Sequence, residues 1–240
     1  MDEQTILQNG GITVKGEFLW GSNYTFLVNV EYSEEKVLAV YKPSRGERPL
    51  WDFPAESLAH REVAAYLVSQ ALGWNFVPPT AFRDQAPLGP GSLQLFIEHD
   101  PEYHYFTFSN RDIQRLRRVV VFDYLINNAD RKGSHILKDE GGHLWLIDHG
   151  LCFHEEDKLR TVLWDFIGED IPGTICEDLS QIYSSLSAPA AGIPLLSAQL
   201  LAHLSSQEVN ALAARAERLV VNGRFPAPDP ERRPFPWPQL

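Results

Sequence analysis

The sequence has few cysteines and no long apolar run, and these two absences exclude several classes of protein. Its 240 residues contain only Cys152 and Cys176, too few for a disulfide framework or a cysteine-based zinc cluster. A reducing, cytoplasmic setting fits such a composition best. No stretch of about 18 consecutive apolar residues is present, so we expect no membrane-spanning helix. The acidic start, residues 1–3, lacks the apolar core of a signal peptide.

Positive charge is also scarce. The chain has 21 Lys and Arg against 32 Asp and Glu, which gives a net charge of 21 − 32 = −11. Phosphate backbones and anionic lipid surfaces repel such a chain, so we expect no nucleic acid partner and no stable membrane association. The HExxH, GxSxG, GxxxxGK[ST] and GxGxxG motifs of other enzyme classes are missing as well.

Apolar residues make up 44% of the chain, enough for a globular core. Short segments rich in β-branched and aromatic residues predict strands over Gly11–Phe18, Asn23–Tyr32, Lys36–Tyr41 and Ser92–Glu98. Between them, apolar residues recur at helical spacing over Ser57–Leu72. We therefore expect residues 1–98 to form an antiparallel sheet with one packed helix.

The second part of the chain, residues 99–224, is predicted to be mainly helical. Helical spacing of apolar residues covers Arg111–Asn127, Leu159–Ile167, Ile175–Leu186 and Leu195–Val221. Residues 225–240 contain six prolines, so they are predicted to form an irregular, proline-rich tail.

Two charged residues in the first part fit a phosphate-binding site. Lys42 ends the third predicted strand, and Glu62 lies in the helix that follows. A strand lysine paired with a helix glutamate is what protein-kinase-type sites need; the alternatives are an edge lysine and a solvated glutamate. In the first hairpin, the small residues Gly21, Ser22 and Asn23 would let backbone N–H groups approach phosphate oxygens, although such hairpin tips are common.

Two aspartates in the second part complete the candidate site. Asp130 follows a predicted helix and precedes Arg131, which suits a base or an orienting group; a simple turn cap is the alternative. Asp148 follows a short apolar strand and is two residues from Gly150, as in a metal-holding Asp-x-Gly element. An ordinary turn aspartate is the alternative there.

The order of these features is that of a bilobal kinase. The stretches AVYKPSRGERP, REVAAYLVSQALGWNFVPPT, GSLQLFIE, FDYLINNADRKGSHIL and LWLIDHGLCF resemble the phosphatidylinositol 3-/4-kinase-like atypical kinases, especially the type II phosphatidylinositol 4-kinase branch and its bacterial members. The resemblance covers roughly residues 16–153. It implies an α+β, protein-kinase-like fold with an antiparallel-sheet N-lobe and a mainly helical C-lobe.

The resemblance also implies roles in binding ATP. Lys42 would contact the α- and β-phosphates and Glu62 would hold Lys42 in place. Asp130 would orient or deprotonate the acceptor hydroxyl, Arg131 would brace its loop, and Asp148 would bind Mg²⁺ or Mn²⁺. Gly21, Ser22 and Asn23 would form the hairpin that covers the phosphates. Backbone groups near Gln94 and Phe96 would bind adenine, and Ile147 would line the adenine pocket.

Two positions depart from the family pattern. Five residues after Asp130, where relatives usually carry a metal-binding Asn, this chain has His135, and imidazole suits Mn²⁺ or Zn²⁺ better than Mg²⁺. That substitution fits a Mn²⁺ preference, one-metal chemistry or a degenerate enzyme. Residues 154–160 lack the excess of basic residues that an anionic lipid headgroup would require.

The sequence therefore predicts a phosphotransferase that depends on ATP and a divalent metal. Its expected acceptor is a hydroxyl of a protein or small molecule rather than a membrane phosphoinositide. The alternatives are a nucleotide-binding pseudokinase with a regulatory role, and a kinase-fold enzyme that transfers AMP.

Overall fold

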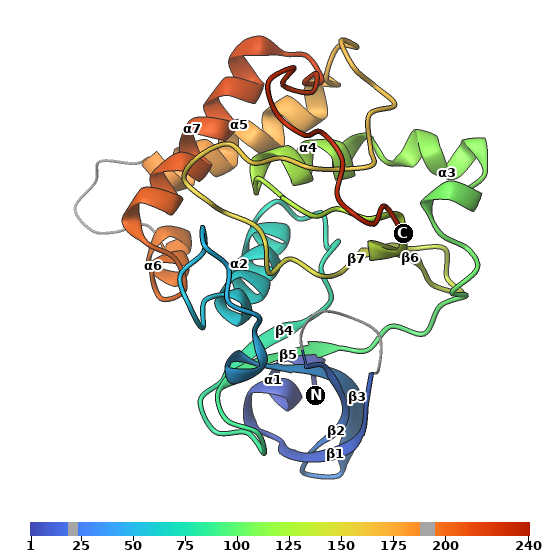
Figure 1. Ribbon diagram of the computed structural model, residues 1–240, viewed down its shortest axis with the longest axis vertical. Helices are drawn as coiled ribbons and strands as arrows, with labels where there is room; N and C mark the ends of the chain where they lie inside the picture. The colour runs from blue at the N-terminus through green and yellow to red at the C-terminus, as the bar shows by residue number, and fades with distance from the viewer. Residues whose placement is uncertain (19–23, 188–194) are drawn as a thin grey trace.

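The computed structural model describes residues 1–18, 24–187 and 195–240, which form two lobes (Figure 1). The smaller lobe contains a five-stranded antiparallel sheet with the strand order β1-β2-β3-β5-β4. The predicted antiparallel sheet is confirmed. Its strands are β1 (Gly11–Glu17), β2 (Phe26–Tyr32), β3 (Glu35–Pro43), β4 (Thr80–Arg83) and β5 (Gly91–Leu95).

A short helix that the sequence analysis missed packs against this sheet. Helix α1 (Glu3–Asn9) begins after Asp2, whose side chain accepts a hydrogen bond of 2.7 Å from the backbone N–H of Thr5. Such an N-cap stabilises a first turn by about 1 kcal/mol. Ile6 and Leu7 are buried in the core of the small lobe. Two buried residues in seven are too few to reveal a helical period in the sequence.

The predicted helix of the first part is α2 (Leu58–Ala71), and Gly73, with φ of 66°, follows its end. This helix contacts β4 and β5, but its buried Ala64 and Val68 belong to the core of the larger lobe. Helix α2 therefore lies between the lobes, which places its residues beside both. The division of the chain at residue 98 stays a prediction.

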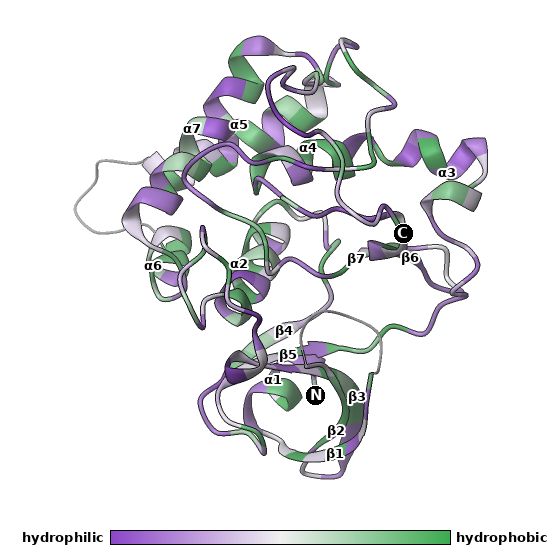
Figure 2. Cartoon of the chain, viewed as in Figure 1, coloured by the Kyte–Doolittle hydropathy of each residue, from purple (hydrophilic) through white to green (hydrophobic). Residues whose placement is uncertain are grey.

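The larger lobe is mainly helical. In Figure 2 the coil of α7 alternates between hydrophilic and hydrophobic colours, as expected for a helix with one buried face. No helix within the described ranges is both long and apolar enough to cross a bilayer. The elements are α3 (Asn110–Arg115), α4 (Arg117–Leu125), α5 (Gly173–Ser187), α6 (Leu195–Leu201), α7 (Ser206–Asn222), β6 (Ile136–Lys138) and β7 (Leu144–Leu146).

Three helix predictions are wrong, and the first of them, over Arg111–Asn127, is divided at Leu116 into α3 and α4. Leu159–Ile167 contains no helix, because its backbone pairs with Arg131 instead: the N–H of Arg131 donates to Arg160, and the N–H of Val162 donates to Arg131. The single helix predicted over Leu195–Val221 is two helices, α6 and α7. A capping box between Ser205 and Glu208 starts α7 afresh, and local capping outweighs the continuous apolar period.

The proline-rich tail contains no helix or strand and is attached to the larger lobe. Phe225 is buried in the core. Further along, the carbonyl of Pro234 accepts a hydrogen bond of 3.0 Å from the N–H of Thr161, and the carbonyl of Gln239 accepts one of 2.8 Å from the N–H of Gly133. The tail therefore runs back across the helical lobe and ends beside β6 and β7 (Figure 1).

Candidate functional site

A cleft of about 450 Å³ is lined by residues of both lobes. The sheet contributes residues from β3 and β5, and the helical lobe contributes the loops around β6 and β7. The structure thus brings together in one cleft most of the site residues expected from the sequence. Those that line it are Lys42, Glu62, Gln94, Phe96, Asp130, His135, Ile147 and Asp148.

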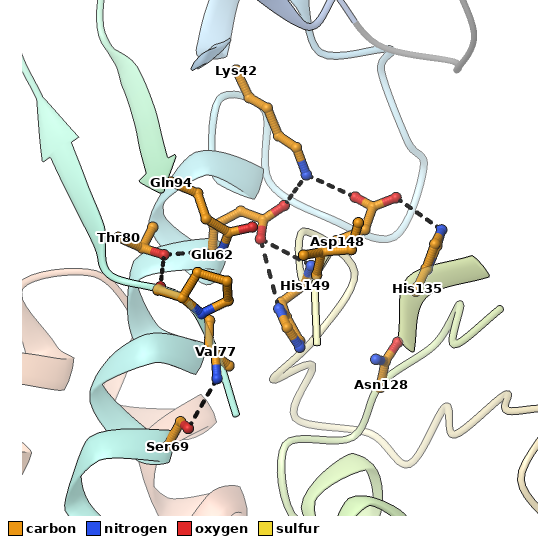
Figure 3. Close-up of polar contacts among 12 residues, drawn as sticks. Lys42, Glu62, Ser69, Val77, Thr80, Gln94, Asn128, His135, Asp148 and His149 are labelled. Carbon is orange, nitrogen blue, oxygen red and sulfur yellow. Dashed lines mark hydrogen bonds and ion pairs between the residues drawn. The ribbon is translucent and has the colours of Figure 1, made fainter. Parts of the chain in front are cut away.

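The ammonium of Lys42 lies between the carboxylates of Glu62 and Asp148 (Figure 3). Its Nζ donates to Oε1 of Glu62 at 2.5 Å and to Oδ1 of Asp148 at 2.9 Å. Burial alone would lower the pKa of Lys42, but Asp148 and Glu62 outweigh that effect and raise it. Lys42 in turn holds the pKa of Asp148 well below its usual range, so both Lys42 and Asp148 stay ionised at neutral pH.

Glu62 is held from both sides. One carboxylate oxygen accepts from Lys42, and the other accepts a hydrogen bond of 2.9 Å from the backbone N–H of His149. The side chain of Glu62 is only 3% exposed, so the solvated-glutamate alternative does not apply. Through these bonds Glu62 links β3 of the small lobe to the segment that carries Asp148.

Asp148 has an unusual backbone conformation. Its φ of 62° lies in the left-handed region, which residues other than glycine rarely adopt. Hydrogen bonds fix both neighbours, from Arg131 to the carbonyl of Ile147 and from the N–H of His149 to Glu62. A conformation of this kind persists only where the surroundings impose it, and such residues gather at functional sites.

The donor atoms around Asp148 fit one divalent cation. Oδ2 of Asp148 lies 3.3 Å from Nε2 of His135, and burial lowers the pKa of His135 to about 4. The imidazole is therefore neutral at pH 7 and able to ligate a metal. Among the described residues, no three His, Cys, Asp or Glu side chains converge as a metal cage. A cation here would need oxygens from phosphate and water, which is how Mg²⁺ is usually held.

Arg131 braces the loop from behind rather than lining the cleft. Its fully buried guanidinium contacts both carboxylate oxygens of Asp123 at 2.9–3.1 Å and donates to the carbonyls of His135 and Ile147. A further contact of 2.9 Å joins it to Nε2 of His149. Arg131, for which the family resemblance implied a bracing role, thus has the geometry of a positioning residue.

Asp123 is a residue that the sequence analysis missed. It lies in α4 and is fully buried, and it accepts hydrogen bonds from Arg131 and from the amide of Asn128 at 3.2 Å. A signal for it was present, because an acidic residue within the apolar run VVVFDYL of an amphipathic helix needs a buried partner. The identity of that partner depends on the tertiary fold.

Asp130 presents its carboxylate to the cleft. Its backbone N–H donates to Oδ1 of Asn128 at 2.9 Å, and its Oδ2 lies 3.2 Å from Nζ of Lys132. Burial raises the pKa of Asp130, while Lys132 partly lowers it. An ionised, partly desolvated carboxylate of this kind can accept a hydrogen bond from a hydroxyl group.

Two of the expected adenine contacts already have partners inside the sheet. The backbone of Gln94 pairs with Val40 of β3 and Thr80 of β4, and the backbone N–H of Phe96 donates to the carbonyl of Leu38 at 3.0 Å. A base in the cleft would have to use other backbone groups of residues 94–98. The expected phosphate-covering residues Gly21, Ser22 and Asn23 lie outside the described residues.

Comparison with known proteins identifies the class. Residues 53–182, more than half of the chain, match the family model of phosphatidylinositol 3- and 4-kinases. The chain is 39% identical to Protein Rv2133c of Mycobacterium tuberculosis, over 99% of this chain and 95% of that protein. The chain therefore belongs to the phosphatidylinositol 3- and 4-kinase family.

Phosphatidylinositol 4-kinase gamma 4 of Arabidopsis thaliana is a more partial match. It is 34% identical over 44% of this chain, and the match spans only 23% of the plant protein. Two solved structures share the overall fold. Hydra Fam20 with sugar has a TM-score of 0.61 at 14% identity, over 91% of this chain and 87% of that one. The proinflammatory kinase CtkA of Helicobacter pylori has a TM-score of 0.50 at 13% identity, over 89% and 97%. These likenesses establish the bilobal, kinase-like fold, and with the family they support a phosphotransferase.

Proposed function

We propose that this protein is a phosphotransferase that depends on ATP and a divalent cation and acts on a hydroxyl of a protein or small molecule. One observation carries the proposal: Lys42 contacts both Glu62 and Asp148 in the same cleft that contains Asp130. Phosphoryl transfer demands positioning and charge neutralisation rather than covalent chemistry from the protein. These four residues offer those elements.

In this reaction the ammonium of Lys42 binds the α- and β-phosphates, and Glu62 keeps it directed into the cleft. Asp148 and His135 hold the divalent cation, which when bound neutralises phosphate charge. Asp130 accepts the hydrogen bond of the acceptor hydroxyl and takes its proton as the oxygen–phosphorus bond to the acceptor forms. The bond between the γ-phosphorus and the bridging oxygen breaks, and ADP leaves.

The acceptor is proposed not to be a membrane phosphoinositide. In the segment that follows Asp148, Lys158 pairs with Asp52 at 2.9 Å. Asp157 accepts from the guanidinium of Arg218 at 2.9 Å through both oxygens. Lys158, one of the two basic residues among residues 154–160, is thus already paired, and the same stretch carries three acidic residues, which leaves it poorly suited to an anionic headgroup.

A nucleotide-binding pseudokinase is the second candidate, and His135 is the observation that favours it. An imidazole stands where the family usually has an Asn, and burial keeps it neutral. Nitrogen is a poorer ligand than oxygen for Mg²⁺. Binding of nucleotide without transfer is the expected behaviour in that case.

The test compares wild type with Asp148→Asn by thermal shift and by transfer of labelled phosphate from ATP, with Mg²⁺ and then Mn²⁺. At about 100 times its Kd, a ligand stabilises the native state by about 2.7 kcal/mol. We expect a metal-dependent shift in wild type that Asp148→Asn loses, together with a roughly thousandfold loss of transfer. Asp170→Asn, at an exposed carboxylate that does not line the cleft, serves as the matched control.

The outcomes separate the candidates. A shift that needs no metal, survives Asp148→Asn and comes without transfer would replace the enzyme with the pseudokinase. No shift with any nucleotide and metal would rule out both, and the family likeness would then be one of fold alone.

A further inference from the structure

A second cavity, of about 200 Å³, lies in the helical lobe, away from the cleft. Its walls come from α4, from α7, from residues 157–164 and from residues 226–234 of the tail. None of the residues assigned to phosphoryl transfer lines it. Its lining includes three guanidinium groups and one indole: Arg215, Arg232, Arg233 and Trp164.

Arg215 is a buried cation without a carboxylate of its own. It is 1% exposed, and its Nε and one terminal nitrogen donate to the carbonyls of Leu125 and His154. The other terminal nitrogen is buried and has no partner among the described groups. Its nearest carboxylate, Asp157, is 3.8 Å away and already accepts from Arg218 through both oxygens. The buried positive charge is therefore incompletely compensated, which is costly in a protein interior.

Two further side chains that line the cavity also lack a partner that would compensate them. The indole Nε1 of Trp164 is buried and has no acceptor among the described residues. An indole N–H can only donate, and buried donors are almost always paired. Arg233 has no ion pair within the described parts of the chain, whereas Arg232 pairs with Asp229 at 3.2 Å. The cavity thus has a surplus of donors and of positive charge.

We propose that this cavity binds a phosphate-type oxyanion, either free phosphate or a phosphate monoester, held by Arg215, Trp164 and Arg233. Such a group only accepts hydrogen bonds and carries negative charge, so it supplies what these donors lack. The guanidinium of Arg233 can bind such a group through two nitrogens, and Arg215 offers it the one terminal nitrogen that has no partner. Water occupies about 30 Å³ per molecule in the liquid, so the cavity holds a phosphate group with room for a few waters.

The two carboxylates on the cavity wall do not cancel this preference. Asp157 is neutralised by Arg218 and Asp229 by Arg232, so each already has its own counter-ion. The surplus cations are Arg215 and Arg233. Because α7 provides the first and the tail provides the second, a bound oxyanion would also fasten the tail to the helical lobe.

The first experiment is isothermal titration of the full chain with inorganic phosphate at 150 mM NaCl, repeated with O-phosphoserine. Trp164→Phe removes one donor but keeps an aromatic ring, and Arg233→Gln removes one charge from an irregular segment. We expect each variant to raise the Kd by about tenfold, the usual scale for a hydrogen bond to a charged group. Arg111→Gln, which makes the same charge change at an exposed site, leaves the Kd unchanged.

A variant of the nucleotide cleft separates this site from the proposed function. Lys42→Met is expected to keep wild-type affinity for phosphate, whether or not the protein transfers phosphate from ATP. Tighter binding of O-phosphoserine identifies a monoester site, and equal or weaker binding identifies a free-phosphate site. The proposal is overturned by absence of saturable binding, by unchanged Kd in both cavity variants, or by loss of binding in Lys42→Met.

Limited proteolysis gives a second readout. Trypsin can cleave after Arg232, within the segment that lines the cavity. At a phosphate concentration near the wild-type Kd, phosphate is expected to slow this cleavage clearly more in wild type than in Trp164→Phe. If the wild-type chain is cleaved at the same rate with and without phosphate, a bound oxyanion does not attach the tail to the helical lobe. Circular dichroism of both variants confirms that they fold.

Discussion

Two buried arginines of the helical lobe are balanced in different ways. Arg131 contacts both oxygens of Asp123, and neither side chain is more than 1% exposed. Arg215 is nearly as buried, but its nearest carboxylate lies 3.8 Å away, is half-exposed and is shared with Arg218. Both arginines also donate to backbone carbonyls, so the counter-ion is the main difference between them.

This difference in counter-ions indicates a different role for each arginine. Arg131 has a complete set of partners within the chain, so it can hold the loops of Asp130 and Asp148 in place without any ligand. Arg215 has an incomplete set, so a ligand can gain from it. A buried ion pair is weak evidence for stability but good evidence for positioning, because its partners tolerate few arrangements.

The largest expected effect comes from breaking the complete pair. Asp123→Asn leaves the guanidinium of Arg131 buried without its counter-ion, so we expect the free energy of unfolding to fall by about 3 kcal/mol. Urea denaturation measures it. The matched change Asp157→Asn affects a half-exposed carboxylate and should cost less than about 1 kcal/mol.

Equal losses in these two variants would contradict the contrast between the two arginines. A wild-type stability in Asp123→Asn would show that the carbonyls of His135 and Ile147 suffice to hold Arg131.

A second prediction concerns the cleft that Arg131 supports. His135→Asn replaces an imidazole nitrogen with an amide oxygen, which suits Mg²⁺ better. We expect the transfer rate with Mg²⁺, divided by the rate with Mn²⁺, to rise by about tenfold. Such a change corresponds to about 1.4 kcal/mol in the activation free energy. The measurement is transfer of labelled phosphate with each metal. An unchanged ratio would mean that His135 does not contact the metal.

The smallest expected effect is on pH dependence. If Asp130 takes the proton of the acceptor, kcat/KM falls as the pH drops through the pKa of Asp130. Burial raises that pKa, so the acidic limb should lie above the ordinary aspartate value of about 3.9. Lys132 favours the ionised form, and Lys132→Met should therefore move the limb upward by less than about one pH unit.

Lys36→Met, at an exposed lysine of the sheet, is the control for this shift. If the acidic limb of the kcat/KM profile falls at the same pH in Lys132→Met as in wild type, a group other than Asp130 sets that limb.

Local sequence patterns predicted much of this molecule. The antiparallel sheet, helix α2 and helix α5 followed from apolar period and turn residues, which act over a few neighbouring positions. The helix predicted over Leu159–Ile167 failed because backbone pairing with Arg131, nearly 30 residues earlier, replaced the local preference. The order of Lys42, Glu62 and Asp148 was enough to expect them together.

Only the tertiary structure decided which charged side chains are buried and which groups they pair with. Lys158 and Asp52 are 106 residues apart, and Arg215 lies 61 residues from the carbonyl of His154. Nothing in the sequence near Arg131 marks Asp123 as its partner, and nothing near Arg215 shows that its counter-ion is shared. The physical reason is that local propensity depends on neighbours along the chain, whereas the cost of a buried charge depends on distances in space.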